Sequence, residues 1–437
     1  MPTRLHADAV LPCDAAFSLH RPGVVDIGDD GRIAWVGPAA SAPTLDGARE
    51  ERYSGLLMPG LINTHCHSPM VLFRGAGEDL PLLRWLEEVL WPREAHLTPE
   101  DVYWGMMLAS AELLRFGVTT STEMYFHPEA IADAVEDAGN RAIITPSLIT
   151  SPLLAKGSWQ EQLEQNRALR GSRGDGGGRV EFGLAGHSAY MLPLEALTAI
   201  GRAGIEDEAL LHIHVAESRG EAKALEEREG RSVPRILADI GFFDASRVLT
   251  AHSVWVSDDD LDIYAEYDVA VAHCPQSNSK LASGIAPVSD MLERGIKVGI
   301  ATDGPASNND LDLWEEMRLA PLLQRARTLE ATTLPARTAI GLATSGGAAA
   351  LGRDDIGTLE AGRWADIIHL DTDTTAFVPV TAELDLVSHV LWSASSRHVR
   401  DVWVAGARVV ADDVCLTVDE RGAAQEVQKR AERLASV

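Results

Sequence analysis

Cysteine and long apolar runs are both scarce in this chain of 437 residues. Its four cysteines are far apart in the sequence, which predicts reduced thiols in a cytoplasmic protein and argues against a disulfide framework. No apolar stretch reaches the ~18 residues of a membrane span. The N-terminus also lacks the basic and then apolar pattern of a signal peptide. We therefore expect a cytoplasmic location and no membrane partner.

Basic residues are also scarce. The chain has 38 lysines and arginines against 65 aspartates and glutamates, which gives a formal net charge of -27 at pH 7. This charge would repel a polyanion, and no cluster of lysine and arginine reverses it locally. The composition therefore argues against a nucleic-acid partner and would make a strongly anionic substrate harder to recruit, but it says little about a small, neutral substrate.

The middle of the chain alternates short apolar runs with amphipathic segments. Eight alternations over about 300 residues are typical of a (β/α)8 TIM-like barrel, in which the chemistry lies at the carboxyl ends of the strands. A doubly wound sheet is the alternative, but it does not predict polar residues at so many strand ends. Helices are expected at 100–116, 128–138, 220–229 and 309–325, and strands at 57–63, 118–124, 142–149, 180–186, 210–216, 248–252, 269–273 and 297–302.

Both ends of the chain are predicted to be rich in strands. An Asp-Asp-Gly turn at 29–31 separates two alternating apolar runs, which is a hairpin signal. Similar runs occupy 365–370 and 399–410. The expected fold class is therefore α/β, with residues 58–356 forming the barrel and residues 1–57 and 357–437 together forming a small β-sandwich domain.

A glycine-rich segment at 171–178 precedes the fourth expected strand. It lacks the Gly-Lys-Ser/Thr ending of a phosphate-binding loop. We therefore expect a flexible loop at this position.

The first chemical motif is Asn-Thr-His-Cys-His at 63–67, which directly follows an apolar run. Side chains alternate faces along a strand, so His65 and His67 point the same way and Cys66 points to the other face. Two imidazoles aimed at one point make half of a metal site. The motif alone is weak evidence, and its weight depends on further ligands downstream.

Further polar side chains stand at the ends of other expected strands, namely His214, His252 and Asp303. A single histidine at a strand end is more often a structural residue than a ligand. A purely structural role would have to apply independently to His65, His67, His214, His252 and Asp303. A single site that these residues share is therefore the better interpretation. His212 shares a face with His214 but lies deeper, and we expect it in the barrel interior.

Three neutral imidazoles and one carboxylate suit a divalent metal such as zinc. With one position left for water the metal would be catalytic, because it lowers the pKa of that water toward ~7. Glu217 follows His214 by three residues and could carry the proton from the water to the substrate.

Taken together, these segments resemble the amidohydrolase superfamily, and within it the deaminases of methylthioadenosine, S-adenosylhomocysteine and adenosine. Triazine hydrolases and other base deaminases of this group are similar throughout. The resemblance covers nearly the whole chain. The segments that carry it are 59–67, 73–80, 124–126, 214–217, 273–281, 302–309 and 359–366.

The resemblance implies one divalent metal ion, with zinc preferred and iron(II) or manganese(II) as alternatives. Its ligands would be His65, His67, His214 and Asp303. Glu217 would be the proton carrier to the ring nitrogen, and His252 would orient the attacking water. Asp303 would also pass a proton to departing ammonia.

The resemblance also implies substrate contacts. Glu94 would hold ribose hydroxyls, and His187 would contact the purine. Trp85 is a further candidate contact, although packing is the simpler role for Trp85 and Trp91. The family further implies a homo-oligomer, either a dimer or a tetramer.

Two departures from the family pattern bear on the substrate. Relatives that accept homocysteine place an arginine after the third strand, where this chain has Pro146, and Lys156 is the cation that follows. Proline cannot pair with a carboxylate, and lysine lacks the bidentate geometry of arginine. The segment around His187 also lacks the prolines that are common in relatives.

We therefore expect a zinc-dependent deaminase of methylthioadenosine or adenosine. The alternative within the same chemistry is a hydrolase of another amino- or chloro-substituted heterocycle, such as a triazine, a pterin or another purine. A non-catalytic barrel is a third hypothesis, which the retention of all four expected ligands disfavours.

Overall fold

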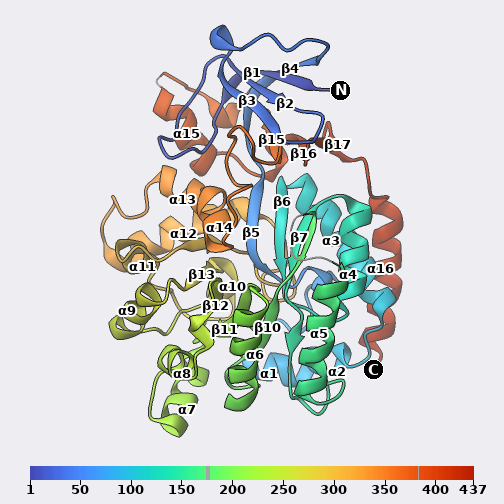
Figure 1. Ribbon diagram of the computed structural model, residues 1–437, viewed down its shortest axis with the longest axis vertical. Helices are drawn as coiled ribbons and strands as arrows, with labels where there is room; N and C mark the ends of the chain where they lie inside the picture. The colour runs from blue at the N-terminus through green and yellow to red at the C-terminus, as the bar shows by residue number, and fades with distance from the viewer. Residues whose placement is uncertain (174–177, 382) are drawn as a thin grey trace.

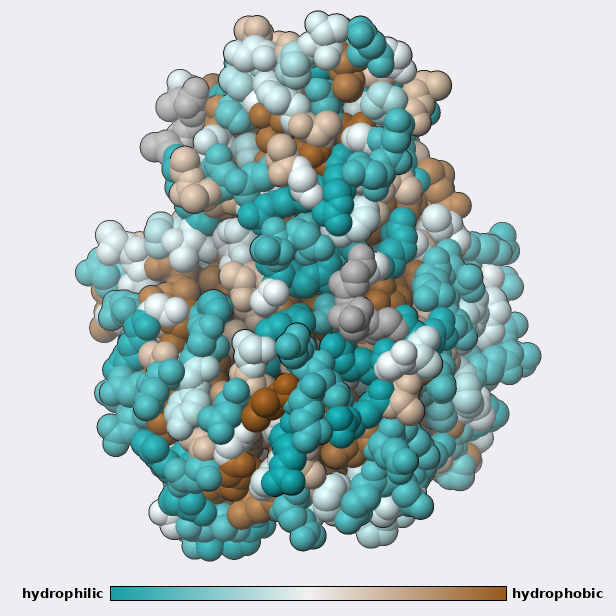
Figure 2. Space-filling view, viewed as in Figure 1, coloured by the Kyte–Doolittle hydropathy of each residue, from teal (hydrophilic) through white to brown (hydrophobic). Residues whose placement is uncertain are grey.

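The computed structural model describes residues 1–173, 178–381 and 383–437. A sheet built from both ends of the chain lies at one end of the molecule, and a larger α/β region lies below it (Figure 1). The face in Figure 2 is mainly hydrophilic, with apolar residues in small patches. Within the described ranges, no helix combines the length and apolarity needed to cross a bilayer.

The α/β region contains parallel strands in two hydrogen-bonded sheets. Every strand expected from the sequence of this region has a counterpart. The first sheet has the order β5 (Leu61–Cys66), β6 (Val118–Glu123), β7 (Arg141–Ile144) and β9 (Val180–Phe182). The second has the order β14 (Val298–Ile300), β13 (Ala270–His273), β12 (Val248–His252), β11 (Leu211–Val215), β10 (Leu184–Ser188) and β8 (Ser147–Leu148).

The two sheets meet on both sides. On one side β7 and β9 lead directly into β8 and β10, and the Gly183 amide donates to the Ile144 carbonyl at 2.8 Å. On the other side Cys66 and Asp303 form a parallel bridge, and the Asp303 amide donates to the His65 carbonyl at 3.2 Å. The end of β5 therefore lies beside the segment that follows β14.

Helices separate the strands, and local sequence sets where several of them begin. The side chains of Thr98 and Ser257 accept from the third residue of α3 and α9, while Asp101 and Asp260 bond back in capping boxes. The four expected helices are confirmed as α3, α4, α7 and α12, with each end within four residues of the expected position. The helices are α1 (Leu82–Trp85), α2 (Trp91–Glu94), α3 (Pro99–Arg115), α4 (Pro128–Ala138), α5 (Trp159–Arg173), α6 (Leu194–Glu206), α7 (Arg219–Glu229), α8 (Val233–Asp239), α9 (Asp258–Glu266), α10 (Pro275–Lys280), α11 (Val288–Glu293), α12 (Leu313–Thr328), α13 (Ala336–Leu342), α14 (Ser345–Ala350), α15 (Glu383–Trp392) and α16 (Glu420–Ala435).

The glycine-rich segment differs from the expectation at its start. Helix α5 continues to Arg173, so residues 171–173 are helical and not part of a loop. The following residues, 174–177, lie outside the described ranges.

The terminal strands form one eight-stranded sheet, whereas the sequence suggested a sandwich of two sheets. The reason is that β15 pairs directly with β4, with Ile367 opposite Pro59, so the C-terminal strands extend the N-terminal sheet. The order is β18 (Val414–Cys415), β17 (Ala407–Ala411), β16 (Val399–Val404), β15 (Ile367–Leu370), β4 (Arg49–Pro59), β1 (Thr3–Val10), β2 (Gly23–Ile27) and β3 (Ile33–Pro38). The hairpin expected around 29–31 is confirmed as β2 and β3.

The first expected strand, 57–63, is divided between two sheets. Strand β4 ends at Pro59 in the terminal sheet, and β5 begins at Leu61 in the parallel sheet. Gly60 lies at the crossing, where a Cβ atom would be 2.2 Å from Thr119 Oγ1. A side chain does not fit at this close approach, so glycine is required where the chain changes sheets.

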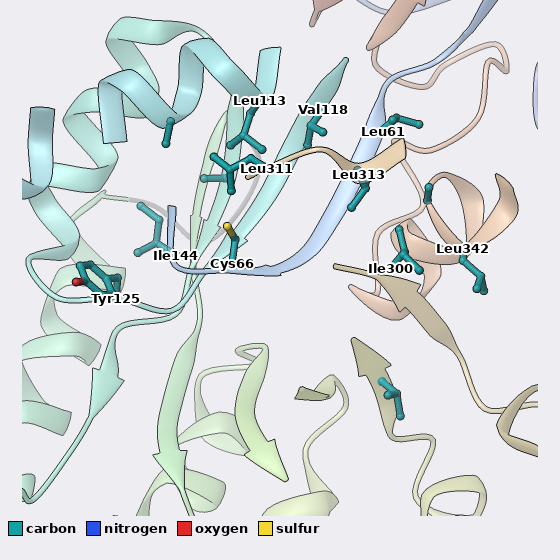
Figure 3. Close-up of a cluster of buried hydrophobic side chains, with 14 of the residues drawn as sticks. Leu61, Cys66, Leu113, Val118, Tyr125, Ile144, Ile300, Leu311, Leu313 and Leu342 are labelled. Atoms are coloured by element: carbon teal, nitrogen blue, oxygen red, sulfur yellow. The ribbon is translucent and has the colours of Figure 1, made fainter. Parts of the chain in front are cut away.

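A shared apolar core supports the start of the parallel region. Leu61, Val118 and Ile300 contribute strand side chains to it (Figure 3). Cys66 is fully buried in the same core, as expected for the residue between two histidines that point elsewhere. The other labelled members are Leu113, Tyr125, Ile144, Leu311, Leu313 and Leu342.

Candidate metal centre and active site

Three histidines and an aspartate from distant parts of the chain converge at the strand ends. Asp303 Oδ1 lies 3.3 Å from Nε2 of His65 and 3.3 Å from Nε2 of His67. Nε2 of His214 lies 3.4 Å from Nε2 of His67. The structure thus brings together the four residues that the sequence singled out as metal ligands.

The Nδ1 atom of each of these three histidines contacts a residue outside the cluster. His214 Nδ1 is 2.7 Å from the carbonyl oxygen of His187, and His67 Nδ1 bonds to the carbonyl oxygen of Met124. His65 Nδ1 is 3.0 Å from His212 Nε2. Carbonyl acceptors require Nδ1 to carry the proton, which leaves the Nε2 lone pair directed at the cluster.

Asp303 is held in a similar way. Its Oδ2 accepts hydrogen bonds from Ser277 Oγ at 2.6 Å and from Ser307 Oγ at 2.8 Å, so Oδ1 faces the histidines. Asp303 and His252 adopt φ values of 61° and 69°, in the left-handed region that non-glycine residues rarely occupy. The strained backbone turns both side chains at the strand ends toward the cluster.

The cluster suits a divalent cation. His65 Nε2 is fully buried and has no hydrogen-bond partner among the described residues, which is costly for a polar atom unless another group satisfies it. Two overlapping sets of donor atoms each lie within 4.8 Å of one another: His65, His214 and His252, and His65, His67 and Asp303. Imidazole nitrogens with one carboxylate form a donor set that zinc and similar metals accept.

Glu217 and His252 lie beside the cluster. His252 Nε2 is 3.8 Å from Glu217 Oε2, and His252 Nδ1 is 2.9 Å from Asn278 Oδ1. Burial raises the pKa of Glu217 to about 8, and the nearby Asp303 carboxylate adds to the rise. Glu217 is therefore a carboxyl group that holds a proton near neutral pH and can release it.

An apolar cavity opens directly over these groups. Its walls include Trp85, Glu94 and His187, as well as Glu217 and Asp303. The structure therefore brings the three residues expected to contact substrate to the same cavity as the candidate metal ligands. The segment from α1 to α2, called the covering segment below, forms one wall of the cavity with Leu82, Trp85, Leu86, Leu90, Trp91 and Glu94.

Glu94 is buried at the inner end of this covering segment. Its Oε1 accepts a hydrogen bond from the Tyr125 hydroxyl at 2.8 Å, and its side chain lines the cavity. Burial raises the pKa of Glu94 to about 7, although the bond from Tyr125 lowers it. The indole of Trp85 donates to the Ala76 carbonyl at 2.8 Å, which fixes the ring as part of the wall.

A second chamber of about 580 Å³ adjoins the first and shares Glu94, Tyr125 and Ile149 with it. Its lining includes Pro146 and, at its exposed edge, Lys156. The chamber therefore extends from Glu94 to Pro146 and Lys156.

Several residues that hold the site had no role in the sequence-based prediction. Ser277, Asn278 and Ser307 lie inside the segments that carried the family resemblance, so motif membership was the available signal. His212 was expected in the barrel interior, and nothing in the sequence indicated its contact with His65.

A set of three histidines and one aspartate at the strand ends, with the buried carboxyl group of Glu217 beside it and a cavity next to it, defines the site of a metal-dependent hydrolase. Comparison with known proteins agrees with this class. The amidohydrolase family matches residues 56–409. The chain belongs to the amidohydrolase family, whose members bind a divalent metal.

Two curated relatives match almost end to end. One is a 5'-deoxyadenosine deaminase from Methanosarcina mazei, 42% identical over 97% of this chain and 96% of the relative. The other is a 5-methylthioadenosine/S-adenosylhomocysteine deaminase from Pelotomaculum thermopropionicum, 39% identical over 97% of both chains.

Solved structures give the same picture. An adenosine deaminase from Xanthomonas campestris with bound zinc is 31% identical and superposes with a TM-score of 0.94, covering 100% of this chain and 99% of that one. An atrazine chlorohydrolase from Arthrobacter aurescens has a TM-score of 0.90 at 24% identity, covering 98% and 100%. At that identity the second structure supports the fold alone.

Proposed function

We propose that this protein is a zinc-dependent deaminase of an adenine nucleoside. It would convert adenosine, or an adenosine with a small neutral 5' group such as methylthioadenosine, to the inosine-type product and ammonia. The observation that supports the proposal is the convergence of the three Nε2 atoms and Asp303 Oδ1 beside the buried Glu217 carboxyl group. Relatives at about 40% identity that are named as nucleoside deaminases support the same reaction.

In the proposed site His65, His67, His214 and Asp303 would hold the ion. The ion would act as a Lewis acid, which makes water a nucleophile near neutral pH. Zinc is the preferred metal because imidazole-rich, four-ligand sites favour it, and the Xanthomonas campestris structure has zinc bound.

The reaction replaces the amino group on the purine carbon with the oxygen of water. Glu217 would donate its proton to the ring nitrogen beside that carbon, which makes the carbon more electrophilic, and would take one proton of the attacking water in its place. His252 Nε2 would orient the attacking water, while Asn278 holds the opposite ring nitrogen. Asp303 would accept a water proton and pass it to the amino group, which leaves as ammonia.

The substrate would lie in the cavity over these groups. Glu94 would accept hydrogen bonds from ribose hydroxyls, His187 would contact the purine, and Trp85 would form the apolar wall beside it. The adjoining chamber would take the 5' group, because it begins at Glu94. Pro146 in its wall offers no cation for a carboxylate, which favours a neutral 5' group over homocysteine.

We further infer the organisation of the molecule from these results. The parallel strands would close into a (β/α)8 barrel of residues 58–356, which the bridge between Cys66 and Asp303 supports. Residues 1–57 and 357–437 would form the second domain. The protein would act in the cytoplasm, where its four unpaired cysteines stay reduced, and would assemble as a dimer or tetramer.

The test is a screen of zinc-loaded protein against adenine nucleosides, free bases and triazines, with ammonia release and the ultraviolet change from adenosine to inosine as readouts. Turnover of adenosine, 5'-deoxyadenosine or methylthioadenosine is expected. The matched control is Glu217→Gln, which keeps the shape of the side chain and removes its proton chemistry. Release of ammonia from bases or triazines alone would contradict the nucleoside assignment.

A further inference from the structure

His212 lies directly behind the candidate metal centre, and the proposed reaction gives it no role. It is fully buried on β11, two residues before His214 and on the same face of the strand. Its Nε2 is 3.0 Å from His65 Nδ1, and its Nδ1 is 3.0 Å from Thr145 Oγ1. His65, Thr145 and His212 are all fully buried, so water cannot replace any of these hydrogen bonds. The donor and acceptor of one bond therefore determine the donor and acceptor of the next.

The chain of hydrogen bonds is anchored at the Thr145 hydroxyl. This hydroxyl donates to the carbonyl oxygen of Glu123 at 3.2 Å, and a hydroxyl has one proton to give. Thr145 Oγ1 therefore accepts from Nδ1–H of His212. A neutral imidazole with its proton on Nδ1 has a free lone pair on Nε2, so His212 Nε2 accepts from Nδ1–H of His65.

The consequence reaches the metal centre through His65. With its proton on Nδ1, His65 presents a lone pair at Nε2, the buried atom that faces Asp303. If every bond ran in the opposite direction, His65 would carry its proton on Nε2. A protonated Nε2 cannot ligate a metal, so only one direction of the chain is compatible with a bound ion.

We propose that His212, oriented by Thr145, is a positioning residue that fixes the tautomer of His65 and thereby sets the affinity for the divalent ion. The proposal rests on the metal-dependent function proposed above, but it concerns metal affinity and not the choice of substrate. The proposal gives a role to His212 and Thr145, two buried polar residues behind the candidate ligands.

The experiment compares two substitutions of Thr145 with two of His212. Thr145→Val replaces the hydroxyl with a methyl group of similar size, and Thr145→Ser keeps the hydroxyl. His212→Phe removes both nitrogens from a ring of similar shape, and His212→Gln keeps groups that can accept and donate. Zinc affinity is measured on metal-depleted protein by competition with a chromophoric chelator, and the ligand geometry is followed by the visible absorption of cobalt(II).

We expect Thr145→Val and His212→Phe to weaken zinc binding about 10- to 100-fold, the usual effect of removing an outer partner of a metal-ligating histidine. Thr145→Ser should bind zinc close to wild type, and His212→Gln should fall between the extremes. At saturating zinc the KM for nucleoside should stay unchanged in all folded variants. If Thr145 and His212 had a purely structural role, their substitution would lower the melting temperature. It would not weaken zinc binding while leaving KM unchanged.

Wild-type zinc affinity and an unchanged cobalt spectrum in Thr145→Val would overturn the proposal, whatever the His212 variants do. If His212→Phe fails to fold, the pair of Thr145 variants still decides the question. Failure of the proposed function would look different, because the wild-type protein would then bind zinc and release no ammonia from any nucleoside.

Discussion

Glu94 gives the sharpest test of the proposed substrate. Its carboxylate would accept hydrogen bonds from ribose hydroxyls, and a substrate without ribose would not need it. Glu94→Gln keeps the size of the side chain and an acceptor for the Tyr125 hydroxyl, but removes the charge. Hydrogen bonds to a charged acceptor contribute about 1.5–3 kcal/mol each, against about 0.5–1.5 kcal/mol for neutral ones. For two ribose hydroxyls the loss is about 2–3 kcal/mol, or roughly 30- to 150-fold in kcat/KM.

The pH dependence supplies a second readout. The pKa of Glu94 is raised by burial to about 7, so the carboxylate becomes protonated as the pH falls through neutrality. A protonated carboxyl is a weaker acceptor for ribose, so kcat/KM for a nucleoside should decrease below pH 7 in the wild type. The Glu94→Gln variant keeps the titration of the metal-bound water but loses that of Glu94, so its kcat/KM should decrease less steeply below pH 7 than that of the wild type.

The same group should influence stability in the opposite direction. The pKa of Glu94 rises from 4.5 to about 7 on folding, so the unfolded chain loses this proton first as the pH increases. Folding stability therefore falls between pH 4.5 and 7, by roughly 3 kcal/mol in total, and stays lower above pH 7. Urea unfolding should find Glu94→Gln more stable than wild type at pH 8 and equal to it at pH 4.

The assay is steady-state kinetics on adenosine from pH 5.5 to 9, with Glu87→Gln as the matched control on the exposed side of the same covering segment. The control should behave as wild type. If Glu94→Gln deaminates adenosine with wild-type kcat/KM at pH 8, Glu94 does not hold ribose and the nucleoside proposal loses its main contact.

Further predictions concern the metal, the proton carrier and the 5' chamber. Glu217→Gln should lower kcat by about 10²–10⁴-fold with zinc content unchanged, measured by turnover and metal analysis on the same sample. Ser277→Ala combined with Ser307→Ala frees Asp303 Oδ2 and should weaken zinc binding by roughly 2 kcal/mol, while an unchanged affinity would show that the serines do not orient the carboxylate. Pro146→Arg should raise kcat/KM for S-adenosylhomocysteine relative to methylthioadenosine, with Pro146→Gln as the uncharged control. Removal of metal by a chelator should abolish ammonia release, and the ion that restores most activity among zinc, iron(II) and manganese(II) identifies the preferred metal.

Much of the parallel region could be predicted because each strand is a short apolar run bounded by an amphipathic helix. The four expected metal ligands also come together, since strand parity and the common edge of parallel strands determine where such side chains point. The roles assigned to these residues stay predictions until the variants are measured.

The terminal region could be predicted less well. The alternating pattern identified the hairpin of β2 and β3, but it carries no information about which strand of the C-terminal part pairs with β4. That pairing joins Ile367 to Pro59 across most of the chain, so a sandwich of two sheets and one continuous sheet have the same local sequence signals. The apolar run at 57–63 likewise gave no sign that Gly60 divides it between two sheets.

Contacts between side chains were the least predictable part of the site. The hydrogen bond between His212 and His65 depends on how far β5 and β11 are shifted against each other along the strand direction. These two strands are far apart in the sequence, and no local pattern determines that shift. The covering segment from α1 to α2 was expected to contribute Glu94 through family resemblance, whereas the apolar wall that its other side chains form became evident only in the folded chain.

The crossing at Gly60 has a consequence for how the protein is made on the ribosome. Strand β4 continues almost directly into β5, which carries His65 and His67, yet the strand that pairs with the outer edge of β4 is β15. Because β15 is synthesised after all the parallel strands, the apolar stretch Leu56–Pro59 emerges long before its partner and must be shielded meanwhile. Chains that end before residue 367 would leave this edge open, so a prematurely terminated product should be captured by chaperones or degraded.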